Sequence, residues 1–122
     1  MRYCQVLDLK DDPALIAEYE IHHQAVWPEV LNHLRLAGVE DMTIWRYQNR
    51  LIMLLEVGDD FSFERLAAME GSNPKVQEWE QLMWRYQCAM PGSVEGKWQL
   101  SKELFKLSTA LLSCDGVQQP RV

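Results

Sequence analysis

The sequence lacks any long apolar run. The longest, from Leu51 to Leu55, spans five residues, whereas a membrane-crossing helix needs about 20. Near the N-terminus the chain turns acidic at Asp8, before the apolar segment of a secretory signal peptide has room to form. We therefore expect a cytoplasmic protein that has no membrane partner.

Clusters of Lys and Arg are also missing, and the formal net charge at pH 7 is −6. Proteins that bind nucleic acids neutralise phosphates with clustered basic side chains. The charge balance therefore argues against a nucleic-acid partner. It is compatible with a neutral polar substrate.

Cysteine is scarce and odd in number, with Cys4, Cys88 and Cys114 forming neither a CxxC motif nor a Cys/His ligand spacing. Three unpaired thiols fit a reducing compartment better than a disulfide scaffold. A Gly-rich phosphate loop, a Ser-centred nucleophile elbow and an evident carboxylate pair for glycoside cleavage are absent too. Phosphoryl transfer, zinc hydrolysis and nucleotide redox chemistry are therefore not first hypotheses, and we expect no metal site.

What is present is one ordinary globular domain: 122 residues, of which 48% are hydrophobic. Expected strands cover residues 2–9, 39–47, 51–57 and 97–107. Expected helices cover residues 13 to 25 or 26, 28–37, 61–69 and 74–89. This order of elements predicts an α+β fold of the ferredoxin-like βαββαβ type over residues 1–107. Residues 108–122 show little periodicity, and we interpret them as a loosely held C-terminal extension.

The strand at 51–57 also predicts an assembly. It is apolar at consecutive positions, so both of its faces favour burial. A ferredoxin-like unit covers only one face of its sheet with helices, and a second copy packed sheet to sheet would cover the other. We predict a homodimer, a dimeric α/β-barrel. The alternative is that the C-terminal tail folds over the open face.

The strongest local signal lies at the end of the first helix. Tyr19 and His23 are four residues apart, so they share a helix face, and Trp27 follows before a proline corner. A phenol beside an imidazole can transfer protons, although Tyr19 and Trp27 can equally be core residues around a partly buried, satisfied histidine. His22 lies about 100° around the helix and should not share that pocket. His33, on the next helix, is expected to face solvent.

Two tryptophans lie on the helix predicted at 74–89. An indole face is a good platform for the C–H surface of a sugar, but it is more often used in packing. We assign Trp84 to packing. The spacing alone leaves Trp79 open between the two uses.

Longer motifs resemble a known family. The segment 18–30 resembles the signature E-Y-x-x-x-H-x-x-I/V-W-P-E of the L-rhamnose mutarotase family. Residues 73–79, followed by Met90-Pro91 and a closing Glu-Leu-Phe at 103–105, resemble the second half of the same family. The resemblance covers roughly residues 2–107, nearly the whole domain.

The resemblance implies a dimeric ferredoxin-like enzyme that interconverts the α and β anomers of a deoxy-sugar pyranose without a cofactor. His23 matches the family's proton donor, and Tyr19 matches a tyrosine that contacts the substrate. Trp79 falls in the segment of the substrate-contacting tryptophan, and we expect Trp27 to contact the sugar as well. Ring opening would use His23 as the acid or base, with Tyr19 orienting either His23 or the ring oxygen.

Two departures from the family pattern concern the sugar rather than the chemistry. Met42 replaces a pocket tyrosine on the second strand, and Glu80 replaces the second of two adjacent tryptophans. This variant form resembles the branch associated with L-fucose. The methyl group of a 6-deoxy sugar needs an apolar wall, for which Met42 and Met53 are candidates.

The first hypothesis is therefore a mutarotase, an aldose 1-epimerase, acting on a 6-deoxy-L-hexose such as L-rhamnose or L-fucose. The second is a dimeric-barrel monooxygenase or haem-binding protein on the same architecture, in which His23 would serve as haem ligand. The third is a non-catalytic sugar-binding module. Haemin titration separates the second from the first, and exchange between anomers separates the third.

Overall fold

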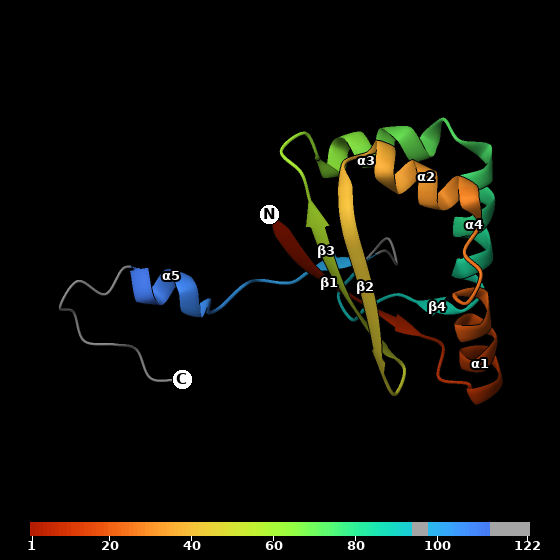
Figure 1. Cartoon of the computed structure of the whole chain (residues 1–122). Helices are drawn as coiled ribbons and strands as arrows, with labels where there is room; N and C mark the ends of the chain where they lie inside the picture. Colours follow the sequence, from red (N-terminus) through yellow and green to blue (C-terminus); the bar gives the residue numbers. More distant parts are fainter. Residues whose placement is uncertain (94–97, 113–122) are drawn as a thin grey trace.

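The computed structural model describes residues 1–93 and 98–112. In chain order the elements are β1 (Arg2–Leu9), α1 (Pro13–His22), α2 (Pro28–Leu36), β2 (Val39–Tyr47), β3 (Arg50–Val57), α3 (Phe63–Gly71), α4 (Pro74–Trp84), β4 (Gln87–Cys88), β5 (Gln99–Leu100) and α5 (Leu107–Leu112) (Figure 1).

The sheet has the strand order β2-β3-β1-β4, and every pairing in it is antiparallel. Helices α1 to α4 lie together on one side of it (Figure 1). Each helical connection of the βαββαβ pattern is thus built from two consecutive helices. The prediction of an α+β, ferredoxin-like fold is confirmed. The homodimeric assembly stays a prediction.

The start of α1 follows directly from the sequence. Asp12 accepts hydrogen bonds from the backbone N–H groups of Ala14 and Leu15, and Pro13 occupies the first turn, where its missing N–H is not needed. The helix ends at His22, three or four residues earlier than predicted. Residues 23–25 continue as a tight turn whose N–H groups bond three residues back, and Trp27 is already extended before Pro28.

The second helical connection was predicted with the wrong ends. Helix α3 begins at Phe63 rather than at residue 61, because Ser62 caps it by accepting from the N–H of Arg65 at 3.0 Å. Helix α4 ends at Trp84 rather than at residue 89. The chain leaves it to form β4, and directly before that strand the carbonyl of Tyr86 accepts from the N–H of Lys10 at 2.8 Å. Residues 87 and 88 therefore pair with β1 instead of continuing the helix, and the local sequence does not encode that pairing.

The predicted final strand, 97–107, is mostly not a strand. Only β5 pairs, with Gln5 and Val6 of β1, and Lys97 lies outside the described residues. Helix α5 begins at Leu107, inside the predicted strand.

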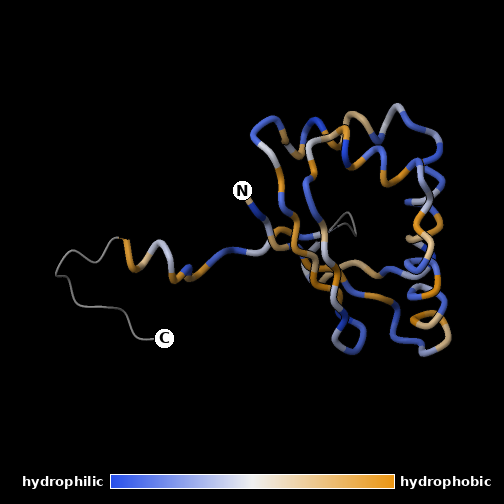
Figure 2. The backbone as a smooth tube through the Cα atoms, viewed as in Figure 1, coloured by the Kyte–Doolittle hydropathy of each residue, from blue (hydrophilic) through white to orange (hydrophobic). Residues whose placement is uncertain are grey.

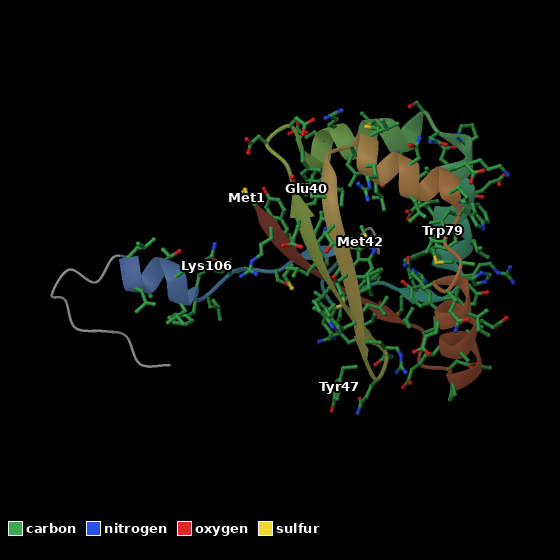
Figure 3. The ribbon with its side chains drawn as sticks, in the orientation of Figure 1. Met1, Glu40, Met42, Tyr47, Trp79 and Lys106 are labelled. Carbon is green, nitrogen blue, oxygen red and sulfur yellow. The ribbon has the colours of Figure 1, made fainter. Side chains whose placement is uncertain are left out.

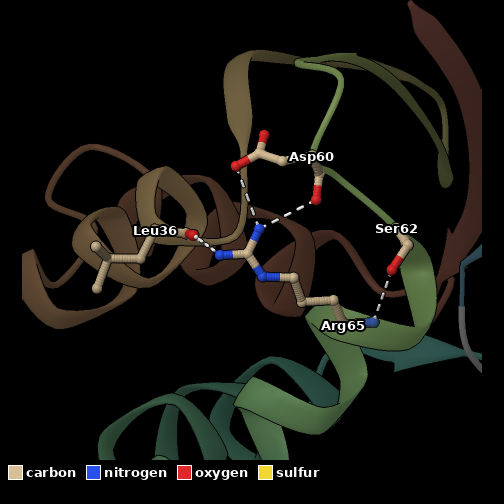
Figure 4. Close-up of polar contacts among 4 residues, drawn as sticks. All are labelled: Leu36, Asp60, Ser62 and Arg65. Atoms are coloured by element: carbon tan, nitrogen blue, oxygen red, sulfur yellow. Dashed lines mark hydrogen bonds and ion pairs between the residues drawn. The ribbon is translucent and has the colours of Figure 1, made fainter.

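Arg65 ties the helices together at one end of the sheet. Its guanidinium donates to the carbonyl of Leu36 at the end of α2 at 2.9 Å, and to the carbonyl of Asp60 at 3.0 Å (Figure 4). The carbonyls at a helix end have no partner within the helix, so this side chain satisfies one of them. It fixes where α2 lies relative to the loop that enters α3.

Two hydrophobic clusters fill the space between the sheet and the helices. The first, here the Tyr19 cluster, consists of buried residues from both layers: Leu9, Tyr19, Val30, Leu51, Trp79, Met83 and Tyr86. The second, here the Met53 cluster, consists of buried strand residues: Val39, Met53, Leu55 and Val57. Strand β3 is apolar along most of its length (Figure 2) and supplies residues to both clusters.

The other side of the sheet carries apolar residues without a helical cover. Ile52 and Leu54 of β3 are half-buried there, and Trp45 and Tyr47 of β2 are 51% and 70% exposed. The segment that ends in α5 projects away from the sheet (Figure 1), so the described part of the tail does not fold over this face. None of the helices in the described ranges combines the length and the apolar character that a bilayer span demands.

Candidate active site

Tyr19 and His23 lie side by side at the end of α1. Their ring centroids are 4.3 Å apart with an interplanar angle of 36°, Tyr19 is buried, and His23 is half-buried. The four-residue spacing thus brings the phenol and the imidazole together as predicted. Helix α1 ends at His22, and a tight turn begins at His23. The imidazole therefore lies at the C-terminal end of the helix and is only half-buried.

The hydrogen bond of His23 fixes its tautomer. Nδ1 lies 3.0 Å from the carbonyl oxygen of Tyr19, which can only accept, so Nδ1 carries the proton. In a neutral ring Nε2 then holds a lone pair. No residue that the structure describes hydrogen-bonds to Nε2, and this atom is available to a ligand.

The environment of His23 favours that neutral form. Burial lowers the pKa of the imidazole, and the nearby His22 lowers it further, while the hydrogen bond to the Tyr19 carbonyl opposes the shift. At neutral pH the ring is therefore mainly uncharged and able to accept a proton through Nε2. The protonated ring formed by that step is a strong enough acid to return the proton at once.

Tyr19 has the opposite character. Burial raises the pKa of its phenol to about 12; a hydrogen bond with the side chain of Gln87 opposes the rise, and the negative charge of Glu80 adds to it. The phenol therefore stays protonated at neutral pH and acts as a hydrogen-bond donor, not as a base. Gln87 is buried at the start of β4. Sequence reasoning missed Gln87 because it placed the residue inside a helix.

Trp79 closes the aromatic group from α4. It is buried, and its ring centroid lies 5.7 Å from that of His23 and 5.3 Å from that of Trp27, with edge-on geometry in both pairs. The C-terminal end of α1, the start of α2 and the middle of α4 thus bring their aromatic side chains into contact. Tyr19 and Trp79 are at the same time members of the hydrophobic core, so packing and ligand contact are compatible uses of the same rings.

The two methionines predicted to face the sugar lie on the other layer. Met53 is buried in the Met53 cluster, and Met42 is half-buried against it. Figure 3 shows Met42 on the sheet and Trp79 on α4, in the two layers that face each other. The structure thus brings Tyr19, His23, Trp27 and Trp79 into contact, and it places Met42 and Met53 in the neighbouring cluster.

His22 has partners of its own. Its Nε2 is 3.2 Å from the hydroxyl of Tyr86, a buried residue whose ring centroid lies 6.3 Å from that of Tyr19. The two adjacent histidines therefore contact different aromatic residues. His22 influences His23 electrostatically, since it lowers the pKa of the His23 imidazole.

Two predictions about single residues are wrong. His33 does not face solvent: it is 3% exposed, and its Nε2 lies 3.9 Å from a carboxylate oxygen of Glu70 on α3. Helix α2 packs against α3 and α4 as well as against the sheet, so the side of α2 that carries His33 is covered. Trp84 does not pack in the core but is 46% exposed, since it is the last residue of α4.

Comparison with known proteins gives these residues a context. A sequence model of the L-rhamnose mutarotase family matches residues 2–107. An L-fucose mutarotase of Xanthomonas campestris pv. campestris is 48% identical over 113 residues, which are 90% of each chain. These matches cover both halves of the motif around His23 and Trp79.

Solved structures agree on the fold. An L-rhamnose mutarotase from Formosa agariphila superimposes with a TM-score of 0.65 at 21% identity, over 87% of this chain and 97% of that one. A tetracenomycin F2 cyclase from Streptomyces glaucescens, a type-II polyketide cyclase, gives a TM-score of 0.57 at 21% identity, over 87% and 95%. At such identities the likeness concerns the fold alone, because one fold serves several chemistries.

Proposed function

Because this chain belongs to the L-rhamnose mutarotase family, we propose that it interconverts the α and β anomers of a 6-deoxy-L-hexose by acid–base opening of the pyranose ring. The observation that carries the chemistry is the contact between the rings of Tyr19 and His23, with Nε2 of His23 free of any described partner. The 48% identity to an L-fucose mutarotase makes L-fucose the first candidate and L-rhamnose the second.

The reaction needs one group that both takes and returns a proton. Nε2 of His23 removes the proton of the anomeric hydroxyl, the bond between C1 and the ring oxygen breaks, and its electron pair goes to that oxygen. The imidazolium then passes the same proton to the ring oxygen, leaving a neutral open-chain aldehyde. After the aldehyde rotates, reclosure reverses these steps, so no proton is gained or lost overall.

Tyr19 assists as a fixed donor. Its neutral phenol, with a pKa of about 12, offers a hydrogen bond to the oxygen on which negative charge develops. Its ring is held by burial, so the donor is oriented before the sugar arrives. Trp79 and Trp27 offer aromatic surface to the C–H face of the sugar, and Met42 and Met53 form the apolar wall for its C6 methyl group.

The test is an anomer-exchange panel measured by saturation-transfer NMR on L-fucose, L-rhamnose, D-galactose and D-glucose. We expect acceleration for the two 6-deoxy-L-sugars, with L-fucose ahead. If no sugar exchanges faster than in buffer, the mutarotase proposal fails. A haem-binding protein on this architecture is not favoured by the comparisons; it would shift the Soret band of added haemin.

We also propose that the protein is a cytoplasmic homodimer with its two sheets packed face to face, and that residues 108–122 are a C-terminal extension of the catalytic domain, of which residues 113–122 lie outside the described residues. The half-buried Ile52 and Leu54 and the exposed Trp45, all on the uncovered side of the sheet, support the dimer.

Leu54→Lys is expected to convert the dimer to a monomer, because it places a charge in the middle of the apolar contact. Light scattering after size exclusion measures the mass directly. Leu36→Lys is the matched control, since Leu36 is 59% exposed on α2, among the helices, and should leave the mass unchanged. A Leu54→Lys protein that keeps the mass of the wild type would move the interface to another surface.

A further inference from the structure

The residues proposed to hold the sugar belong to two different clusters. Tyr19 and Trp79 are in the Tyr19 cluster, whereas Met53 is in the Met53 cluster and Met42 packs against it. A pyranose that contacts both groups must lie where the two clusters meet. The side chains that pack against both clusters therefore mark that place.

Three described residues pack against both: Leu34 of α2, Ile44 of β2 and Trp98. Leu34 and Ile44 are aliphatic and belong to the framework of the two layers. Trp98 differs in two ways. It lies in the segment between β4 and β5, and it alone of the three has a polar atom in its side chain.

The pairing of β5 explains how Trp98 reaches this position. Gln99 and Leu100 pair with Val6 and Gln5 of β1, so extending the register by one residue sets Trp98 beside Leu7. Leu7 is fully buried on the helix-facing side of the sheet. Trp98 is only half-buried there, and its indole N–H has no hydrogen-bond partner among the residues that the structure describes.

From these observations we infer that Trp98 is a specificity-determining residue of the sugar site, at the junction of the two clusters. Its ring face packs against the apolar part of a 6-deoxy sugar, and its indole N–H donates to a sugar hydroxyl. A large aromatic ring with one donor at its edge suits a ligand that is apolar on one side and hydroxylated at the rim. This inference rests on the proposed mutarotase function, since it concerns the same sugar.

The experiment compares Trp98→Ala, Trp98→Phe and the control Trp84→Ala in the full-length chain, with anomer exchange measured over a range of L-fucose concentrations. Trp98→Ala should raise KM about tenfold or more while kcat changes less than about threefold, because binding area is lost and the proton-transfer groups stay. Trp98→Phe keeps a ring but loses the donor, so KM should rise about threefold to tenfold. Trp84→Ala removes the same side chain from the exposed end of α4 and should leave both constants unchanged.

The outcomes separate the two proposals. If the wild-type protein exchanges no sugar, the mutarotase proposal is wrong and the role of Trp98 falls with it. If the wild-type protein is active and Trp98→Phe, checked as folded by circular dichroism, keeps its KM for L-fucose, then Trp98 is a packing residue and only this inference is overturned. A folded Trp98→Ala protein with an unchanged KM for L-fucose would overturn the inference as well. If Trp98→Ala does not fold, the result for Trp98→Phe alone decides.

Discussion

Replacing His23 with Ala should reduce anomer exchange by about 100-fold or more, the range expected when a general acid–base group is removed. The size of the effect follows from the geometry. Nε2 is the one nitrogen of His23 without a described partner, and Nδ1 is held by the carbonyl of Tyr19. Truncation removes the proton carrier and leaves the aromatic surface of Trp79 in place. Sugar binding should therefore weaken much less than turnover.

The control is His22→Gln, the neighbouring histidine on the same helix end. His22 contacts Tyr86 rather than the Tyr19 and Trp79 rings, so its loss should leave the rate at pH 8 close to that of the wild type. If His23→Ala keeps full activity while Trp79→Ala abolishes binding, the acid–base assignment is wrong although the family is right.

The pH profile gives a second reading of the same group. The reactive form of His23 is neutral, and burial lowers its pKa, so the rate should rise with pH through a value below 6.5 and level off above it. In His22→Gln the second cause of that lowering is gone. The acid limb should therefore move toward higher pH. A profile that is flat from pH 5 to 8 would argue against His23 as the titrating group.

Local sequence was sufficient where local forces decide the structure. Helix starts were expected at residues 13 and 74, and each is observed with a cap in which the side chain of Asp12 or Asn73 accepts a hydrogen bond from the backbone. Four-residue spacing predicted the contact of Tyr19 and His23. The strands expected at 39–47 and 51–57 are observed as β2 and β3, which pair as an antiparallel hairpin with one irregularity between Val39 and Asp41.

Local sequence failed where a distant segment decides. The end of α4 depends on pairing of β4 with β1, about 80 residues earlier in the chain, so Gln87 was assigned to a helix and its bond to Tyr19 was missed. His33 on α2 is covered by α3, and the strands β2 and β3 lie between these two helices in the chain. Trp98 could not be singled out at all, because its position follows from two residues of strand pairing and not from any periodicity.

The other large effect should appear in stability. Trp79 is 5% exposed and contacts His23 and Trp27, so Trp79→Ala removes a large ring from a packed position and should cost about 3–5 kcal/mol of unfolding free energy. Trp84 lies five residues further along the same helix but is 46% exposed, and Trp84→Ala should cost less than about 1 kcal/mol. Urea unfolding followed by circular dichroism, at one fixed protein concentration because of the expected dimer, measures both.

This pair of variants also decides how the site is built. A large loss for Trp79→Ala means that the sugar platform is part of the core, so the ring is oriented before the ligand binds and its position is shared by α1, α2 and α4. A loss no greater than that of Trp84→Ala would mean that the ring is held loosely in solution. The edge-on contacts with His23 and Trp27 would then form only around a bound sugar, and the orientation of His23 would depend on its substrate.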